Sequence, residues 1–412
     1  MADGVERPAS FGSVLAVPEF RAIWLAELQS VFGDQLARVA LSVLVYDRTG
    51  SAAWPALTYA LTYLPDLIGG PLLSGLADRF PRKAVMVNAD AGRAVLVGLM
   101  AIPGLPLWLL ATLLVLTQLL NAPFTAAQAA IMPSVLSGDK YVAGQSIRQM
   151  TGQTGQLAGF ALGGAVIAAI GPGKGLAVDA VTFAVSALVI RFGVRSRPAA
   201  GANADGTKVS LFSGLVAGAR TIWSDSRLRS LVMLAWLAGF VIVPEGLAVP
   251  YAAEIGGTAA TAGLLLAAHP AGIVVGVFLF GRLVAPGTRQ RLIGVLAVLA
   301  IVPLVGYALR PGLLPAIGLL LASGACAAYQ VTAAATFMRL VPDAERGQAF
   351  GLAGSGLIAA QGVGLVVGGL LAAVLRSPAL TVAVVAAVGV LVALPVAAAW
   401  RRARRTFPLL PL

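Results

Sequence analysis

Three ionisable residues in the first long apolar stretch of the chain have the chemistry to bind or transfer a proton. Glu27, Asp34 and Arg38 are 7 and 4 residues apart, so in a helix they share one face. At about 1.5 Å per residue, Asp34 lies roughly 21 Å from Phe20, near the middle of a membrane-spanning helix. An ionisable side chain at that depth is costly and normally faces a cavity or a charged partner. We expect Asp34 or Glu27 to exchange a proton or to contact a cationic substrate; the alternative is that Asp34 and Arg38 neutralise each other.

Three more polar residues interrupt apolar stretches beside prolines. Asp66 follows a proline, and its carboxylate either titrates in a cavity or caps the turn that the proline breaks. His269 is the only histidine, and an imidazole titrates near neutral pH, which suits proton coupling. The alternative for His269 is a neutral ring bonded to a backbone carbonyl that the following proline frees. Glu245 lies between a proline and a glycine, and we expect Glu245 or His269 to line an outer cavity.

The composition determines what kind of element must position these residues. Of 412 residues, 58% are hydrophobic and only 11% are charged, whereas an ordinary soluble domain has about 25% charged residues. Such a chain has too few charges to cover a water-soluble surface. This excludes a soluble enzyme, a secreted domain and a disordered scaffold, and it predicts an integral membrane protein.

The apolar stretches are long enough for about twelve membrane helices of roughly 20 residues each. We expect helices near residues 20–46, 54–76, 84–102, 106–132, 143–170, 174–194, 229–251, 258–284, 290–308, 312–338, 348–375 and 378–400. These define a six-helix bundle over 1–194, a linker over 195–228, a second six-helix bundle over 229–400 and a basic tail over 401–412. The linker repeats apolar residues at helical spacing, which predicts an amphipathic helix on the membrane surface. Those residues are Phe212, Leu215, Val216, Ala219, Ile222 and Trp223.

The basic residues report the topology. Most of the 29 lysines and arginines fall on one side of the membrane when the N-terminus is placed in the cytoplasm, so both termini are expected there. They punctuate apolar stretches and form no single soluble face, so the net charge of +12 does not indicate nucleic acid. The single cysteine, Cys326, cannot form an internal disulfide.

The two halves echo each other weakly. Basic residues follow the second and the eighth helix, and prolines end the fourth and follow the tenth. This pattern favours a transporter built from repeats, with its site where the halves meet. The sequence contains no metal-ligand or phosphate-loop motif, so no metal and no cofactor are expected. A membrane enzyme, the rival class, would need carboxylates clustered at one membrane face, whereas here they are spread over different depths.

The loop after the second helix carries the most specific motif. The stretch Ser74–Lys83 resembles the loop signature of the major facilitator superfamily, and its matching residues are Asp78, Arg79, Arg82 and Lys83. We expect this motif to act as a gate, because Asp78 can accept hydrogen bonds from a helix N-terminus in one state and lose them in the other.

Further segments resemble the branch that contains macrolide and enterobactin exporters. These are Gly33-Asp34, Val45–Ser51, Asp90 with Arg93-Ala94, Val178–Phe183 and Pro342–Gly347. Asp90 and Arg93 are expected to form a structural pair that supports the gate, and Asp179 a structural contact. Two departures concern the coupling ion: the fourth helix has no arginine, and Phe160 stands where the antiporter glycine motif has proline. Proton antiport is therefore implied by the branch and not by these motifs.

The resemblance implies an all-α integral membrane fold of twelve helices in two six-helix bundles, working by alternating access. It implies proton-driven export of a small hydrophobic or amphipathic compound, such as a drug, a macrolide-like metabolite or a siderophore. The expected setting is the bilayer of a bacterial plasma membrane, with the protein as a monomer. The alternatives are an uptake permease or uniporter with the same fold and, less favoured, the polytopic membrane enzyme.

Overall fold

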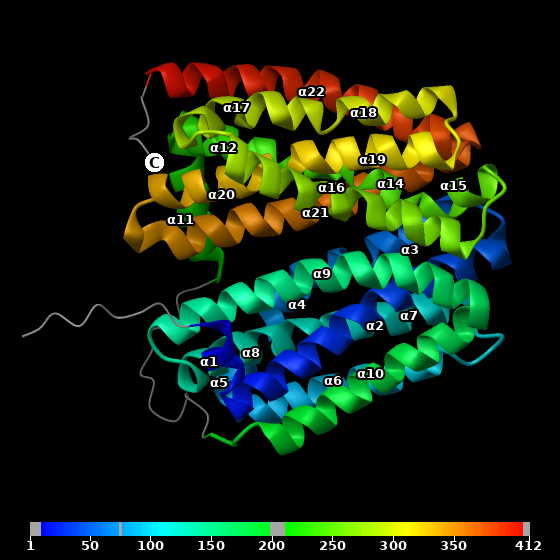
Figure 1. Ribbon diagram of the computed structural model, residues 1–412, viewed down its shortest axis with the longest axis vertical. Helices are drawn as coiled ribbons and strands as arrows, with labels where there is room; N and C mark the ends of the chain where they lie inside the picture. Colours follow the sequence, from blue (N-terminus) through cyan, green and yellow to red (C-terminus); the bar gives the residue numbers. More distant parts are fainter. Residues whose placement is uncertain (1–9, 74–75, 198–210, 407–412) are drawn as a thin grey trace, which may run out of the picture.

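The computed structural model describes residues 10–73, 76–197 and 211–406, and within these ranges the regular structure is helical (Figure 1). The first half contains α1 (Phe11–Leu15), α2 (Pro18–Thr49), α3 (Ala53–Ala60), α4 (Leu64–Leu73), α5 (Leu76–Arg79), α6 (Arg82–Met100), α7 (Leu107–Leu119), α8 (Asn121–Val135), α9 (Asp139–Ile170) and α10 (Pro172–Gly193). The second half contains α11 (Leu211–Ser224), α12 (Ser226–Trp236), α13 (Ala238–Val241), α14 (Val243–Gly246), α15 (Ala248–Glu254), α16 (Ala259–Leu283), α17 (Pro286–Leu299), α18 (Val302–Val305), η2 (Gly306–Leu309), α19 (Leu313–Ala327), α20 (Tyr329–Leu340), η3 (Asp343–Glu345), α21 (Arg346–Leu375) and α22 (Pro378–Thr406).

Nine helical segments of the described ranges are long and apolar enough to cross a membrane. Three more passes, α2, α3 with α4, and α6, complete a twelve-pass arrangement. The second of these passes breaks at residues 61–63, and the other two carry several charged residues. Charged groups in a membrane helix turn inward, toward protein or water. The expected all-α membrane fold of two helical halves is confirmed.

Among the described residues, the closest packing between the two halves lies toward one end of the molecule. We call the end that holds α1 and the last turn of α22 the terminal end, on the left of Figure 1, and the opposite end the far end. Near the far end, α9 packs on α16, where Gly164 meets Gly263, and α21 packs on α3, where Gly369 meets Ala53. Glycine allows this close approach because it has no Cβ. Toward the terminal end the two halves diverge (Figure 1).

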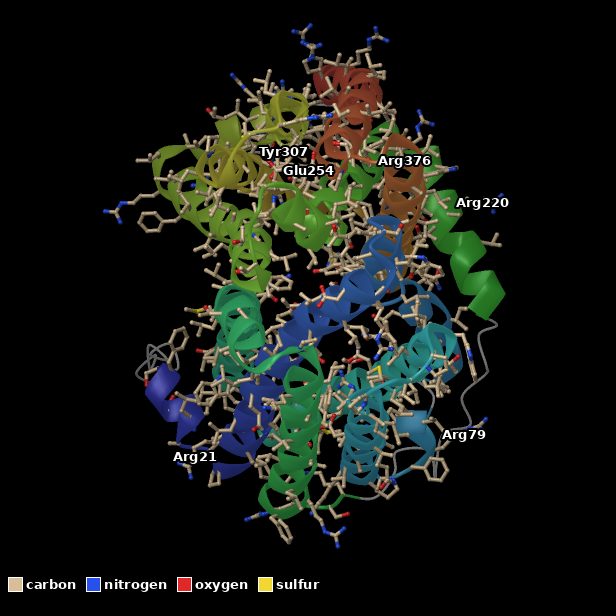
Figure 2. The ribbon with its side chains drawn as sticks, turned by 90° about the vertical axis from the view of Figure 1, so that its right-hand side faces the viewer. Arg21, Arg79, Arg220, Glu254, Tyr307 and Arg376 are labelled. Carbon is tan, nitrogen blue, oxygen red and sulfur yellow. The ribbon has the colours of Figure 1, made fainter. Side chains whose placement is uncertain are left out.

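The linker contains the expected amphipathic helix, α11, which runs across the direction of the long helices in Figure 1. Its buried side packs against α21, where Gly218 lies against the backbone of Gln348, and Ile222 is fully buried. Half-exposed Trp223 lies 6.1 Å from the ring of Trp236. The helix is thus fastened to the second half, while the side chains of Phe212 and Leu215 and residues 198–210 lie outside the described part. Figure 2, which looks onto the far end, shows Arg220 on α11 at the edge of the second half, with Arg21 and Arg79 on the first.

The predicted basic tail begins as helix. The last helix continues through Arg401–Arg405 to Thr406, because Trp400 and Ala403 are buried and hold the final turns against the bundle. The Trp400 indole N–H donates to the Gln290 carbonyl at 3.2 Å. Residues 407–412 of the tail lie outside the described part.

Candidate functional site

Glu27 lies in a polar cluster formed by three helices near the terminal end. Arg148 of α9 donates to both carboxylate oxygens of Glu27, from Nε at 2.6 Å and from Nη2 at 3.2 Å. The amides of Gln128 in α8 and Gln145 in α9 complete the cluster through bonds of 2.7 Å and 3.2 Å to Arg148. This bidentate geometry is the strongest form of an Arg–carboxylate pair. The pair borders a cavity of about 330 Å³, lined by Glu27, Gln145, Arg148, Gln149, Gly152 and Gln153.

Asp34 forms an ion pair with Arg93 of α6, whereas no ion pair of 4.0 Å or less joins Asp34 to Arg38. Arg38 still attracts the Asp34 carboxylate over a longer distance, so the alternative in which the two neutralise each other stays a prediction. The Arg93 Nη2–Asp34 Oδ1 distance is 3.3 Å, and Arg93 Nη1 lies 3.5 Å from Asp90 Oδ1. The guanidinium of Arg93 also stacks 4.0 Å from the ring centroid of Phe183. The spacing along α2 places Asp34 and Arg38 on one face of that helix, but Asp34 forms its ion pair with Arg93 of α6.

Arg38 instead reaches the interface between the halves. Its guanidinium lies 5.7 Å from the ring centroid of Tyr59 and 5.5 Å from that of Tyr63. The Tyr59 hydroxyl donates to Glu245 Oε2 of α14 at 3.1 Å. Tyr59 and Glu245 are both buried, so this hydrogen bond joins the first half to the second in a water-poor setting. The polar groups of α2 are thereby connected to the contact at the far end.

Asp66 and His269 lie against neighbouring helices. Asp66 faces Asn121, at the break between α7 and α8, and its Oδ1 has no hydrogen-bond partner among the described residues. His269 is buried in α16 beside the backbone of Leu320 in α19, and its Nδ1 likewise has no partner in the described part. The alternative of a bond from His269 to the carbonyl that Pro270 frees stays a prediction. In the described part of the chain, no hydrogen bond or ion pair joins either residue to the Glu27 or Asp34 clusters.

The loop motif is described only in part. Arg82 donates to the carbonyl of Ala130 in α8 at 2.8 Å, which ties the start of α6 to the end of the fourth pass. Arg79 is exposed and Lys83 is partly buried. The side chain of Asp78 lies outside the described part, so its gating role stays a prediction.

The second half contributes an apolar counterpart to the polar cavity. A cavity of about 150 Å³ lies among α12, α20 and α21, and its lining includes Val232, Phe337, Phe350 and Leu357. Arg148 lies 16 residues, or roughly 24 Å, from the Gly164 contact along α9. Phe350 lies 19 residues, or roughly 28 Å, from the Gly369 contact along α21. Both cavities therefore lie toward the terminal end, well away from the glycine contacts that α9 and α21 make near the far end.

The structure shows the surroundings of two residues that the sequence did not single out as site residues, Arg148 and Asp179. Arg148 is one of the arginines that fall within the expected helices, and an arginine within an apolar stretch requires an acidic partner. Asp179 was expected to be a structural contact, but it lines a small internal cavity together with Asp34 and Arg38. No group of three or more His, Cys, Asp or Glu residues suited to hold a metal occurs in the described part of the chain.

Comparisons with known proteins agree with this architecture. The family model described as Major Facilitator Superfamily matches residues 23–245 and 245–411. Macrolide efflux protein A of Streptococcus pyogenes is 23% identical over 371 residues, which cover 86% of this chain and 89% of that protein. Multidrug efflux pump Tap of Mycobacterium tuberculosis is 29% identical over 227 residues, 52% of each chain. The resemblance to the macrolide-exporter branch is confirmed by these relatives.

Solved structures share the fold at low sequence identity. A bacterial homologue of the human lysosomal transporter Spinster, in an inward-facing and unoccupied conformation, has a TM-score of 0.70 at 15% identity and covers 95% of this chain and 98% of its own. A POT family transporter in complex with 5-aminolevulinic acid has a TM-score of 0.74 at 12% identity, covering 93% and 96%. Two matched family segments, apolar helices and a paired-bundle fold lead to one conclusion: the chain belongs to the Major Facilitator Superfamily of membrane transporters.

Proposed function

We propose that this transporter exports a small hydrophobic or amphipathic compound in exchange for protons by alternating access. The observation that carries the proposal is the pair of cavities near the terminal end, polar on the first half and apolar on the second. A compound with one polar and one apolar side finds partners on both walls. The relatives, a macrolide efflux protein and a multidrug efflux pump, support the outward direction.

The distribution of basic residues supports an orientation with both termini in the cytoplasm of a bacterial cell. In that orientation the terminal end faces the cytoplasm, and the closed far end faces outward. The described conformation is then inward-facing, ready to admit a compound from the cytoplasm or the inner leaflet. We assign the protein to the plasma membrane as a monomer.

The polar wall is suited to a weakly polar compound more than to a strongly charged one. Arg148 already neutralises Glu27, so the wall presents glutamine amides and a balanced ion pair. A cationic substrate would have to replace Arg148 at the Glu27 carboxylate. The ion pair gained with the substrate would then be offset by the ion pair lost with Arg148. A neutral amphipathic compound needs no such exchange and hydrogen-bonds to Gln149 or Gln153 directly.

Asp34 is our candidate for coupling to protons. Its side chain is 33% exposed, so water reaches it, while Arg93 beside it is 4% exposed. Protonation of Asp34 would remove one of the two carboxylates that share Arg93, and so change the electrostatic balance between α2 and α6. The contacts from Arg38 through Tyr59 to Glu245 would carry this electrostatic change to the contact between the two halves at the far end. The loop motif with Asp78, Arg79, Arg82 and Lys83 is our candidate for the cytoplasmic gate.

Efflux from living cells tests the proposal. An exporter-deficient bacterial host expressing the protein would be loaded with a panel of amphipathic compounds that includes a macrolide, with and without a protonophore. We expect extrusion of at least one compound, and we expect the protonophore to abolish it. Faster accumulation in the expressing cells would favour an uptake permease, and extrusion that ignores the protonophore would refute the proton-coupled mechanism.

A further inference from the structure

Asp179 of α10 is a fully enclosed carboxyl group without a cation. Its side chain is 1% exposed, and a Cβ at Gly33 would lie 2.4 Å from its Oδ1, so α2 packs directly onto it. No ion pair of 4.0 Å or less joins Asp179 to a described lysine or arginine. An ionised carboxylate in this position would be buried without compensation, which is strongly unfavourable.

The nearby cations are already engaged. The helices that pack most closely on α10 are α2, which presents Asp34 and Arg38, and α6, which presents Asp90 and Arg93. Arg93 is shared between two carboxylates, and Arg38 faces two tyrosine rings. Three carboxyl groups therefore share two guanidinium groups, and one carboxyl group is left over. Asp34 is 33% exposed and pairs with Arg93, and Asp90 pairs with Arg93 and accepts a hydrogen bond from Ser186, so Asp179 is the group left without a charged partner.

The hydrogen bonds of Thr182 indicate which form Asp179 takes. The Thr182 hydroxyl oxygen lies 2.8 Å from the backbone carbonyl oxygen of Asp179 and 3.1 Å from its Oδ1. A hydroxyl has one proton to donate, and the usual acceptor in a helix is the carbonyl of the preceding turn. If Asp179 were ionised, the Thr182 hydroxyl would have to divide its one proton between two acceptors. If Asp179 is protonated, the hydroxyl donates to the carbonyl and accepts from the carboxyl group, so both contacts are full hydrogen bonds.

We propose that Asp179 is a neutral carboxylic acid in this conformation and that it holds the proton which the transporter exchanges. This inference rests on the proton-coupled function proposed above. Asp34 and Asp179 line the same internal cavity of about 30 Å³, which has room for about one water molecule. The proton leaves Asp179 for this water, and a proton of that water passes to the Asp34 carboxylate. The negative charge moves from Asp34 to Asp179, so the total charge of the cluster is unchanged. Arg93 loses the attraction of Asp34 and becomes the cation that offsets the new charge on Asp179.

Infrared spectroscopy of the purified, full-length protein in lipid vesicles at neutral pH tests this assignment. Protonated and ionised carboxyl groups absorb at different frequencies. We expect Asp179→Asn to remove one band of a protonated carboxylic acid. The matched control is Asp225→Asn, which removes a partly exposed, ionised carboxylate paired with Arg227 at a helix N-cap, a position where asparagine also caps. We expect that control to leave the carboxylic acid bands intact.

The outcomes are distinct. An unchanged set of carboxylic acid bands in Asp179→Asn would show that Asp179 is ionised, and it would overturn the proposal. If that variant does not fold, Asp179→Glu replaces it: a shift of one carboxylic acid band supports the assignment, and no shift overturns it. The measurement uses neither substrate nor gradient, so it is independent of the transport proposal.

Transport then tests the coupling role separately. We expect Asp179→Asn to lose proton-driven accumulation of substrate and to retain exchange of labelled for unlabelled substrate. Full proton-driven transport by this variant would overturn the role of Asp179. A wild-type protein that ignores the proton gradient would instead refute the proposed function, whatever the infrared result.

Discussion

The contact between Gly263 and Gly164 should control the balance between the two orientations of the transporter. A Cβ placed on Gly263 would lie 2.7 Å from the Cα of Gly164 and 2.7 Å from the carbonyl oxygen of Phe160. Because an ordinary contact of this kind begins near 3.4 Å, α9 and α16 must separate by roughly 0.7 Å. Overpacking of this size costs about 1–3 kcal/mol.

That cost falls on one conformation only. When the halves separate at the far end, an alanine at position 263 has room, whereas its gain in helix propensity of about 1 kcal/mol is present in both conformations. The substitution Gly263→Ala should therefore shift the equilibrium toward the outward-open form by roughly 5- to 150-fold. The matched control is Gly281→Ala in the same helix, because a Cβ on Gly281 meets nothing within 4 Å.

Pulsed electron spin resonance measures this shift as a distance distribution. Two exposed far-end positions, one on each half, would carry spin labels through Asp47→Cys and Leu309→Cys, with the native cysteine replaced by Cys326→Ala. We expect Gly263→Ala to increase the population at long distance and Gly281→Ala to leave the distribution unchanged. Identical distributions in both variants would refute the argument that this glycine contact closes the far end.

Three other substitutions test the site and the linker. Asp34→Asn should abolish proton-driven export while folded protein remains in the membrane, and undiminished export at normal expression would remove Asp34 from the mechanism. Arg148→Gln should lower the free energy of unfolding by about 1–3 kcal/mol because it leaves Glu27 without its charged partner. In thermal unfolding, the double variant with Glu27→Gln should recover much of this loss. If the losses of the two single variants simply add in the double variant, the pairing is contradicted. Asp225→Ala should cost about 0.5–2 kcal/mol, because the carboxylate caps α12 through the Arg227 backbone N–H at 2.7 Å. Hydrogen bonds from Arg227 lower the pKa of Asp225 in the folded protein, so the stabilisation by the cap is complete above the ordinary carboxyl pKa and disappears as the pH falls through the pKa of the folded state. If the unfolding temperatures of the wild type and Asp225→Ala still differed in strong acid, the cap would be contradicted.

The fold class followed from composition because a bilayer imposes simple requirements. Each pass must satisfy its backbone within a helix and must be about 20 residues long, and both demands are visible in the sequence. The break at residues 61–63 lies next to the turn that Pro65 was expected to break, whereas the break at Leu120 was not expected, because the apolar pattern continues through it. The family resemblance then implied the division into two six-helix bundles, which composition alone does not determine.

The candidate site was predictable only one helix at a time. Periodicity correctly placed Glu27, Asp34 and Arg38 on related faces of α2, but each of them contacts a different helix. Which helix covers which residue depends on the packing of the whole bundle, and a single sequence does not report it. Asp179 shows the same limit. It is buried because Gly33 of α2 approaches it closely, and nothing in the sequence pairs these two positions.

The most direct test of the transport mechanism uses purified protein in sealed vesicles with an imposed pH gradient. A macrolide or another compound identified in the cellular panel would be supplied on the side of the terminal end, and its movement would be recorded together with proton flux. We predict that the compound accumulates against its own gradient while protons move in the opposite direction, and that both flows stop in Asp34→Asn. Accumulation that is the same with and without the pH gradient would contradict proton-coupled export.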